Sequence, residues 1–360
     1  MKNIKILFVI TRADIGGAQN HIELLIKHIP DTYDFVLCSG SDGPLIDVLN
    51  AKGVKTHIIP NLDSKTFFPA FFAIKKIINK EKPDLIHTHS AIASFIGRIA
   101  GWVSGVKTLY TVHGWHFVPN TSLAWRVLGW LLEIIARPCT DAWITVSRFD
   151  KELGVSSGVV NRQKTWIVPN GVEDLPLNPK SESEGILKMV FVARASHEKN
   201  CIEAIEVLEC SDSNVHLTMY VTTDDQLPSL QEKVDSSKRK ADIDLIIDDY
   251  QAGSKLSQYD VILLTSRYEG MPLCLLEGMR AGLAIIASDV CGLNELVKQN
   301  ENGFLYTLYD PAEASYYVNK LLDVEKRQSF GNCSRKLFDR QFLAHHMAER
   351  TNEVYQRLLS

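Results

Sequence analysis

Two carboxylates lie eight residues apart in the segment SRYEGMPLCLLEG, which spans residues 266–278. Glu269 follows an apolar run that is typical of a buried strand, and Glu277 lies inside the apolar stretch that comes after Pro272. A buried carboxylate is costly unless another group bonds it. The spacing therefore indicates that the two acids bind the two ends of an elongated polar ligand, unless Glu277 is an exposed helix residue and Glu269 a simple cap.

The residues between the two acids predict the start of a helix. Proline favours the first turn of a helix because its missing N–H would have no partner there, so we expect the helix to begin at Gly270–Pro272. The backbone N–H groups of Met271 and Leu273, together with the positive end of the helix dipole, then favour an anion. Gly270 allows a ligand to approach the backbone closely.

A pair of cations follows another expected strand. In the segment RASHEKN, Arg194 and Lys199 stand five positions apart just beyond the strand expected at 189–193. Arginine can bind a phosphate through two N–H groups, and lysine acts as a point charge. The two side chains suit a phosphate or pyrophosphate, and solvated loop charges are the alternative interpretation.

The first half of the chain supplies two further candidates. Gly16 and Gly17 stand between a strand and a helix, where backbone amides can face an anion, although their spacing is neither that of a dinucleotide binder nor that of a Walker loop. His113 directly follows the strand expected at 108–112. An imidazole there can bond a sugar hydroxyl or take up a proton, and a buried structural histidine is the alternative.

Metal and disulfide chemistry are not indicated by the sequence. No cluster of His, Asp or Glu has ligand spacing, and the adjacent aspartates of TTDDQ, residues 222–226, predict a polar loop. The seven cysteines are odd in number and form no C-x-x-C pair, so we expect neither a disulfide framework nor a zinc site. A reducing cytoplasm fits this cysteine usage.

Short β-branched runs alternate with longer helical patterns along the whole chain. The expected strands are 4–10, 35–38, 85–88, 108–112 and 142–146 in the first half, and 189–193, 216–221, 244–247, 261–265 and 284–287 in the second. This alternation predicts βαβ units and two parallel sheets. Ligands of such doubly wound sheets bind at the carboxyl ends of the strands, so we expect the site in the cleft between the two halves.

A stretch rich in Pro, Asn, Gly and Ser after residue 167 predicts a linker. We therefore expect one α/β domain over residues 1–170 and a second over residues 171–335. The final helix, at about 334–359, comes after the second sheet is complete, and we expect residues 336–360 to pack back on the first domain.

The composition restricts the class of protein and its partners. The chain has 360 residues, of which 45% are hydrophobic and 23% charged, as in soluble globular proteins. A formal net charge of -4 gives no support to a nucleic-acid partner. No stretch reaches the roughly 18 apolar residues that indicate a membrane span, so any membrane contact is expected to be peripheral.

Two segments favour contact with a membrane surface. Residues 65–82 interleave four phenylalanines with lysines, and residues 122–137 add Trp125, Arg126 and Trp130. Aromatic side chains flanked by lysines suit a helix that rests on an anionic bilayer. The alternative is that the phenylalanines belong to the core and the lysines form a solvated face.

These motifs, in their order, resemble those of the retaining glycosyltransferases of family 4, and the resemblance covers nearly the whole chain. It rests on IGGAQNH near the start, PDLIHTHS at 83–90, TVHGWHF, DAWITVS at 141–147, VPNGV at 168–172, Arg194 with Lys199, Glu269 with Glu277, and GLNELV with NGFLY. The glutamate pair and the preceding Arg and Lys are the specific part.

The resemblance implies the GT-B architecture, in which two Rossmann-like domains face each other across an interdomain cleft. It implies that Arg194 and Lys199 hold the pyrophosphate of a nucleotide-sugar donor, with no cofactor and no divalent metal. It further implies that Glu277 binds the ribose and that Glu269 and, from the opposite domain, His113 contact the donor sugar. The backbone amides that would contact phosphate or sugar are those of Gly17, Met271 and Leu273.

The chain departs from the family pattern at two places. Ala193 and Asn200 stand where relatives usually carry glycine, and YVTTDDQ stands where many have a glycine-rich turn. The second departure leaves the contacts to the nucleotide base open.

The motif HGWHF resembles that of the family branch that builds capsule, O-antigen or exopolysaccharide on a polyprenyl-pyrophosphate carrier. We therefore expect transfer from a UDP-sugar to a lipid-linked saccharide at the cytoplasmic face of the plasma membrane. One alternative is a nucleotide-sugar epimerase of the same fold. Another is a non-catalytic partner that binds a sugar nucleotide in an assembly complex.

Overall fold

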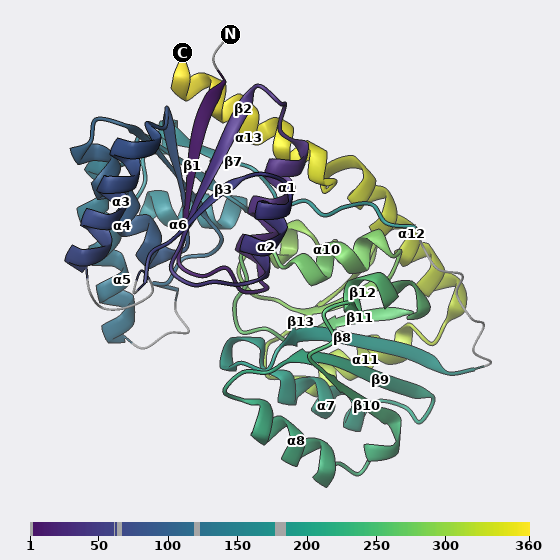
Figure 1. The fold of residues 1–360 in the computed structure, drawn as a ribbon. Coiled ribbons are helices and arrows are strands. Elements are labelled where there is room, and N and C mark those ends of the chain that lie inside the picture. The colour runs from purple at the N-terminus through teal and green to yellow at the C-terminus, as the bar shows by residue number, and fades with distance from the viewer. Residues whose placement is uncertain (1–2, 61, 63–66, 119–122, 177–184) are drawn as a thin grey trace. The chain divides into compact units, whose positions relative to one another are not determined.

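The computed structural model describes residues 3–60, 62, 67–118, 123–176 and 185–360. Two compact units make up the chain. Unit 1 comprises the residues up to Gly171 together with Ala344–Ser360, and unit 2 comprises Val172–Leu343. Each unit is a parallel sheet with helices on its faces (Figure 1). The cleft predicted between the two halves stays a prediction.

The sheet of unit 1 has the strand order β3-β2-β1-β4-β5-β6-β7, so the order reverses between β1 and β4. Its strands are β1 (Ile4–Ile10), β2 (Tyr33–Ser39), β3 (Lys55–Ile58), β4 (Leu85–His89), β5 (Lys107–Val112), β6 (Ala142–Thr145) and β7 (Thr165–Ile167). Its helices are α1 (Gly17–His28), α2 (Pro44–Ala51), α3 (Phe67–Glu81), α4 (Ala91–Val103), α5 (Leu123–Ala136), α6 (Arg148–Ser156) and α13 (Ala344–Leu359).

Strand β1 shows why the two faces of this sheet both need helices. Successive side chains of a strand point to opposite faces, and here both sets are apolar. Ile6 and Phe8 belong to a core that includes residues of α1, α2 and α13. Leu7 and Val9 belong to a second core, which includes residues of α3 and α4. A strand that is buried on both faces has a continuous run of apolar residues, which is typical of a parallel sheet.

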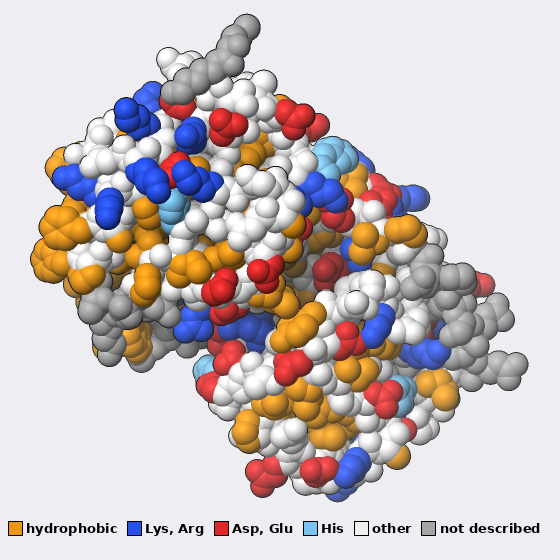
Figure 2. Space-filling view, in the orientation of Figure 1, with side chains coloured by type: hydrophobic (Ala, Val, Ile, Leu, Met, Phe, Trp, Pro, Cys, Tyr) orange, Lys and Arg blue, Asp and Glu red, His pale blue; other side chains and the backbone are white. Residues whose placement is uncertain are grey.

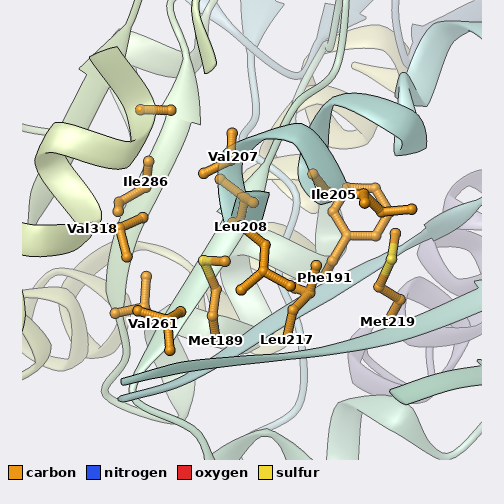
Figure 3. Packing of buried hydrophobic residues seen from close by; sticks show 14 of the residues in the cluster. Met189, Phe191, Ile205, Val207, Leu208, Leu217, Met219, Val261, Ile286 and Val318 are labelled. Carbon is orange, nitrogen blue, oxygen red and sulfur yellow. The ribbon is translucent and has the colours of Figure 1, made fainter. Parts of the chain in front are cut away.

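Unit 2 also contains a parallel sheet, in which the strand order is β10-β9-β8-β11-β12-β13. Its strands are β8 (Leu187–Arg194), β9 (Val215–Thr222), β10 (Ile243–Ile247), β11 (Val261–Leu264), β12 (Ala284–Ser288) and β13 (Gly303–Tyr306). Its helices are α7 (Cys201–Cys210), α8 (Leu227–Ser236), α9 (Ala252–Lys255), α10 (Leu273–Arg280), α11 (Pro311–Lys320) and α12 (Val324–Gln341). Figure 3 shows Met189 and Phe191 of β8 packed with Ile205 and Leu208 of α7.

Each strand predicted from the sequence is present, with ends that differ by two residues at most. Three observed strands were not predicted, namely β3, β7 and β13. All three lie at or next to a sheet edge and have only three or four residues. Strand β3, for example, has the sequence KTHI and no fully buried residue. Such edge strands lack the long apolar run that identifies a central strand.

The prediction of one final helix over 334–359 is wrong. Helix α12 ends at Gln341 and belongs to unit 2, whereas α13 begins at Ala344 and belongs to unit 1. The interruption has a physical cause, because Val172 forms a parallel bridge with Leu343 and donates its N–H to the carbonyl oxygen of Phe342 at 2.9 Å. Helix α13 packs on α1, so residues 344–360 lie on the first domain, but residues 336–343 do not.

In the part of the chain that the structure describes, no helix combines the length and the hydrophobicity needed to cross a bilayer. Within the same residues, no group of three or more His, Cys, Asp or Glu side chains is placed to hold a metal ion.

Candidate functional site

Lys199 and Glu269 form the centre of a charged cluster in unit 2. Lys199 ends a short 3₁₀ turn after β8, and Glu269 follows β11, which pairs with β8. Lys199 Nζ donates to Glu269 Oε1 at 2.5 Å, and Ser266 Oγ donates to the same oxygen at 2.6 Å. Only 19% of the lysine side chain and 8% of the glutamate side chain are exposed. The sequence did not predict this ion pair, which joins residues 70 positions apart.

Lys199 keeps its charge despite its burial. Burial by itself lowers the pKa of Lys199, but the charge of Glu269 and the hydrogen bond to it act in the opposite direction, and the pKa is raised overall. A lysine that stays protonated in a poorly solvated place attracts an anion more strongly than a surface lysine does. The position is therefore suited to a phosphate group.

Arg194, the last residue of β8, is the more exposed of the two cations, with 54% of its side chain accessible. Its Nη1 donates to Asp224 at 3.2 Å and its Nη2 donates to Glu198 at 3.2 Å. Asp224 belongs to the segment TTDDQ, so this segment orients the arginine in addition to being a polar loop. Exposed ion pairs contribute little stability, so a bound anion can replace these partners.

Helix α10 starts later than predicted. Pro272 has φ -71° and ψ 126°, which is an extended conformation, and it caps the helix that begins at Leu273. The prediction of a start at Gly270–Pro272 is therefore wrong by one to three residues. Met271 is buried, and Gly270 is partly buried beside it. The N–H groups of Leu275 and Leu276 donate to the carbonyl oxygen of Pro272 at 3.2 and 3.4 Å, and the N–H of Leu273, the first residue of the helix, precedes these bonds.

Glu277 lies one turn inside α10 and is partly buried. Burial raises the pKa of its carboxyl group, and the charge of Arg280 offsets part of this shift. Among the described residues, no hydrogen bond or ion pair holds this carboxylate. A Cβ atom at Gly253 of α9 would lie 2.8 Å from Glu277 Oε1, so Gly253 leaves the space that the carboxylate occupies. Nothing in the sequence around Gly253 indicates this role.

Two neighbouring groups lie within electrostatic range of the four charged residues. The charges of Arg194, Lys199 and Glu269 all act on the hydroxyl of Tyr268. Burial raises the pKa of the Cys274 thiol to about 12, and the charges of Lys199, Glu269 and Glu277 act on the same thiol. Because such interactions weaken with distance, Arg194 and Glu277 lie in the neighbourhood of the pair formed by Lys199 and Glu269.

The turn that carries Lys199 has an unusual backbone. Asn200 lies in the left-handed region, with φ 51° and ψ 46°. Glycine adopts this region most easily, and asparagine is among the few other residues that tolerate it. Asn200 Nδ2 also donates to Glu203, and Thr265 Oγ1 donates to the carbonyl oxygens of Lys199 and Asn200 at 3.1 and 3.0 Å. The departure from glycine at this position is therefore compatible with the required turn.

In unit 1, the predicted order of strand, glycine loop and helix is confirmed, since α1 begins at Gly17 directly after the extended cap Gly16. His113 follows β5 and is half-buried. The structure adds three histidines that the sequence did not single out, namely His21 of α1 and His87 and His89 of β4. The motifs NH and IHTH contain these histidines, but nothing in the sequence indicates that the two motifs lie next to each other in the fold.

The four histidines form one cluster, of which His21, His87 and His89 are buried. His113 Nε2 lies 3.0 Å from His89 Nδ1, and the ring of His21 meets the ring of His113 edge-on at 4.9 Å between centroids. His87 is bonded at both nitrogens, by the hydroxyl of Tyr355 in α13 and by Thr111 Oγ1, each at 2.7 Å. The final helix therefore contributes to the support of this cluster.

The buried histidines make the stability of unit 1 sensitive to acid. Burial lowers the pKa of His21 to about 4, although its bond to Asn170 acts in the opposite direction. Because the unfolded chain takes up this proton near pH 6.5, the stability is fully present above pH 6.5 and is lost as the pH falls toward 4. For His21 alone the expected loss is about 3 kcal/mol.

This prediction can be measured on the full chain. All six tryptophans lie between positions 102 and 166, so urea unfolding followed by tryptophan fluorescence reports on unit 1. The free energy of unfolding should decrease from pH 6.5 to pH 4.5, and the decrease should be smaller in the His21→Asn variant. An equal decrease in both proteins would show that His21 is not responsible.

Comparison with known proteins identifies the family. The model of Glycosyltransferase Family 4 matches residues 15–174, and the model of Glycosyl transferases group 1 matches residues 177–337. The chain is a family 4 glycosyltransferase. The two matches meet close to the boundary between units 1 and 2, and the charged cluster lies within the second match.

This glycosyltransferase resembles two enzymes of Escherichia coli. It is 28% identical to the UDP-Gal:alpha-D-GlcNAc-diphosphoundecaprenol alpha-1,3-galactosyltransferase, over 93% of this chain and 92% of that enzyme. It is 24% identical to the O-antigen biosynthesis glycosyltransferase WbnH, over 90% of this chain and 91% of that one.

Among solved structures, the glycosyltransferase is similar to HepE of Anabaena in complex with UDP. The TM-score is 0.84 at 16% sequence identity, and the match covers 98% of this chain and all of HepE. HepE has also been solved in complex with UDP-glucose. The predicted GT-B fold, with two Rossmann-like domains, is confirmed.

Proposed function

We propose that this family 4 glycosyltransferase moves a sugar from a UDP-sugar to a saccharide carried on polyprenyl pyrophosphate, with retention of configuration and without a divalent metal. The observation that carries the proposal is the largely buried pair of Lys199 and Glu269, with Arg194 and Glu277 in its electrostatic neighbourhood. The relative that acts on UDP-Gal and GlcNAc-diphosphoundecaprenol and the binding of UDP by HepE support the choice of donor and acceptor.

In this mechanism, the main task of unit 2 is to stabilise the leaving nucleoside diphosphate. Lys199 and Arg194 supply positive charge where negative charge grows on the departing phosphate, and the first N–H groups of α10 add donors. Arginine binds through two N–H groups, whereas the lysine is held in place by Glu269. These two cations supply the charge that a divalent metal supplies in other enzymes.

The carboxylates recognise the sugars. Glu277, whose oxygens have no partner among the described residues, accepts hydrogen bonds from the ribose hydroxyls. Glu269 holds Lys199 through Oε1 and can accept a hydroxyl of the donor sugar with its second oxygen. His113 of unit 1 binds the donor sugar from the first domain, and the N–H of Gly17 contacts phosphate or sugar. The leaving phosphate acts as base for attack on the same face.

The test is a transfer assay with the full chain. The enzyme is incubated with a panel of radiolabelled nucleotide sugars and with a polyprenyl-pyrophosphate-linked acceptor, in the presence and absence of EDTA. We expect transfer from a UDP-sugar that EDTA does not reduce, and a product whose NMR spectrum shows the anomeric configuration of the donor. Inversion or dependence on metal would contradict those parts of the proposal. Isomerisation of the donor without acceptor would identify an epimerase instead.

An exposed stripe on α3 provides a surface for the inner leaflet of the membrane. Phe68 and Phe72 are 70% and 62% exposed, and Lys76 and Lys80 follow at intervals of four residues and are also exposed. Phe67 and Phe71 of the same helix instead pack against the core of unit 1. Figure 2 shows apolar and basic side chains next to one another over the region of α3 and α4.

Replacing Lys76 and Lys80 by glutamine should weaken binding to anionic vesicles by about thirtyfold, because each basic residue near such a surface contributes about 1 kcal/mol. The measurement is co-sedimentation of the full chain with vesicles that contain an anionic phospholipid. The control variant carries Lys238→Gln and Lys240→Gln, which are exposed lysines of unit 2, and should bind like the unchanged protein. Equal binding of both variants would argue against α3 as the membrane surface.

A further inference from the structure

His113 has only one ring nitrogen available for a ligand. Its Nε2 lies 3.0 Å from Nδ1 of His89, so the other nitrogen, Nδ1, is the one that can meet a substrate. A neutral imidazole carries its proton on one nitrogen and a lone pair on the other. Whether Nδ1 of His113 donates or accepts therefore depends on which of the two histidines supplies the proton between them.

The surroundings of His89 decide this question. His89 is fully buried, and its Nε2 has no hydrogen-bond partner among the described residues. If His113 donated to His89, the proton of His89 would sit on this Nε2 as a buried N–H without an acceptor. Orphaned buried N–H groups are rarer in proteins than orphaned acceptors. The favoured arrangement is therefore a proton on Nδ1 of His89, which donates to Nε2 of His113.

His21 shows the same pattern on the other side of His113. Its Nδ1 lies 3.1 Å from Oδ1 of Asn170, which can only accept, so His21 carries its proton on Nδ1. Its buried Nε2 is also without a hydrogen-bond partner among the described residues. In both histidines the nitrogen without a partner is thus the one that bears the lone pair. The cluster contains no buried N–H that lacks an acceptor in this arrangement.

Both members of the pair are neutral near neutral pH. Burial is the largest cause that lowers the pKa of His89, and the charges of His87, His113 and His21 lower it further. Burial likewise lowers the pKa of His113, with a further contribution from His21. Neutral rings are required here, because two protonated imidazoles have no lone pair to share.

We propose that His89 is a positioning residue that holds His113 as its Nδ1–H tautomer, so that His113 donates a hydrogen bond to an oxygen of the donor sugar. The proposal rests on the proposed function for the identity of the ligand, but the tautomer is a property of the free protein. His89 itself is buried and acts only through His113. A donating His113 binds a hydroxyl or phosphate oxygen and cannot act as a base through this nitrogen.

The tautomer can be read from two-bond ¹H–¹⁵N NMR spectra of the full chain labelled with ¹⁵N-histidine, without substrate. The signal of His113 is identified by its loss in the His113→Phe variant. We expect His113 to be protonated at Nδ1 in the unchanged protein. A proton at Nε2 of His113 would overturn the proposal, whatever the enzyme transfers.

A matched pair of variants tests the role of His89. His89→Asn keeps an N–H donor near the position of Nδ1, whereas His89→Leu has a similar size and no donor. We expect His89→Asn to keep the tautomer of His113 and to transfer sugar within about threefold of the normal rate. In His89→Leu the Nδ1–H tautomer should no longer dominate, and the rate should fall by about tenfold.

The outcomes separate this inference from the proposed function. If His89→Leu kept both the tautomer and the rate, His89 would have no positioning role. If no nucleotide sugar were turned over by the unchanged protein, the proposed function would fail, and the NMR result would still decide the tautomer. If the substitutions of His89 prevented folding, the spectrum of the unchanged protein, with the His113 signal assigned through His113→Phe, would remain decisive.

Discussion

Replacing Lys199 by alanine should lower the rate of sugar transfer by about a hundredfold or more. Removal of one group that stabilises developing negative charge commonly costs this much. Lys199 is the less exposed of the two cations of the cluster, and its charge is maintained by Glu269. We therefore expect the loss to appear in kcat, since the charge on the leaving phosphate is greatest in the transition state.

The control for this prediction is another lysine of unit 2. Lys240 pairs with Asp235 at 2.7 Å, and both side chains are largely exposed. Lys240→Ala should leave kcat unchanged, because this exposed pair is not among the contacts that hold the charged cluster. Circular dichroism must show that Lys199→Ala is folded, since Glu269 loses its partner. A folded Lys199→Ala variant with normal kcat would refute the assignment of the site.

Glu269→Gln distinguishes the two roles of this carboxylate. Glutamine keeps a carbonyl oxygen that can accept from Lys199, but it removes the negative charge that raises the pKa of the lysine. If Glu269 only positions Lys199, the loss of rate should be smaller than in Lys199→Ala. If it also binds the donor sugar, the KM for the donor should increase as well.

The largest expected effect on stability comes from Glu133→Ala. Glu133 of α5 lies 2.9 Å from the guanidinium of Arg98 in α4, and both side chains are buried. Arg98 also lies over the ring of Tyr110, 4.5 Å from its centroid. Removing one partner of a buried ion pair typically costs about 3–5 kcal/mol, because the remaining charge is left without compensation in a poorly solvated place.

Unfolding in urea, followed by tryptophan fluorescence, measures this loss in unit 1. The double variant Arg98→Met with Glu133→Leu should regain most of the lost stability, since an apolar pair of similar volume carries no buried charge. Glu152→Ala, which removes an exposed partner of Arg162, should leave the unfolding midpoint almost unchanged. Equal midpoints for Glu133→Ala and Glu152→Ala would show that the buried pair does not stabilise α5.

Local patterns were sufficient to predict the central strands and the residues that follow them. The strands in the middle of each sheet are buried on both faces, so every position along them is apolar and the run is easily recognised. Residues just beyond such runs, including Arg194, Lys199, Glu269 and His113, must then lie at the carboxyl edge of a sheet. The order of these motifs along the chain was also enough to indicate the family.

Contacts between distant parts of the chain could not be predicted in the same way. Three contacts depend on strands that become neighbours only in the folded sheet. In these contacts Lys199 pairs with Glu269, Asp224 accepts a hydrogen bond from Arg194, and His89 pairs with His113. Nothing in the local spacing distinguishes a lysine that is free to bind phosphate from one that is already paired.

The sequence by itself determined the two parallel-sheet domains, the family and the identity of the charged groups, because hydrophobic runs and motif order are properties of neighbouring residues. Only the tertiary structure decided which of these groups touch, which nitrogen of His113 is available, and where the last helix breaks between Gln341 and Ala344. Such features are decided by burial and by hydrogen bonds across strands, since a polar group is left unpaired in the interior only at a high cost.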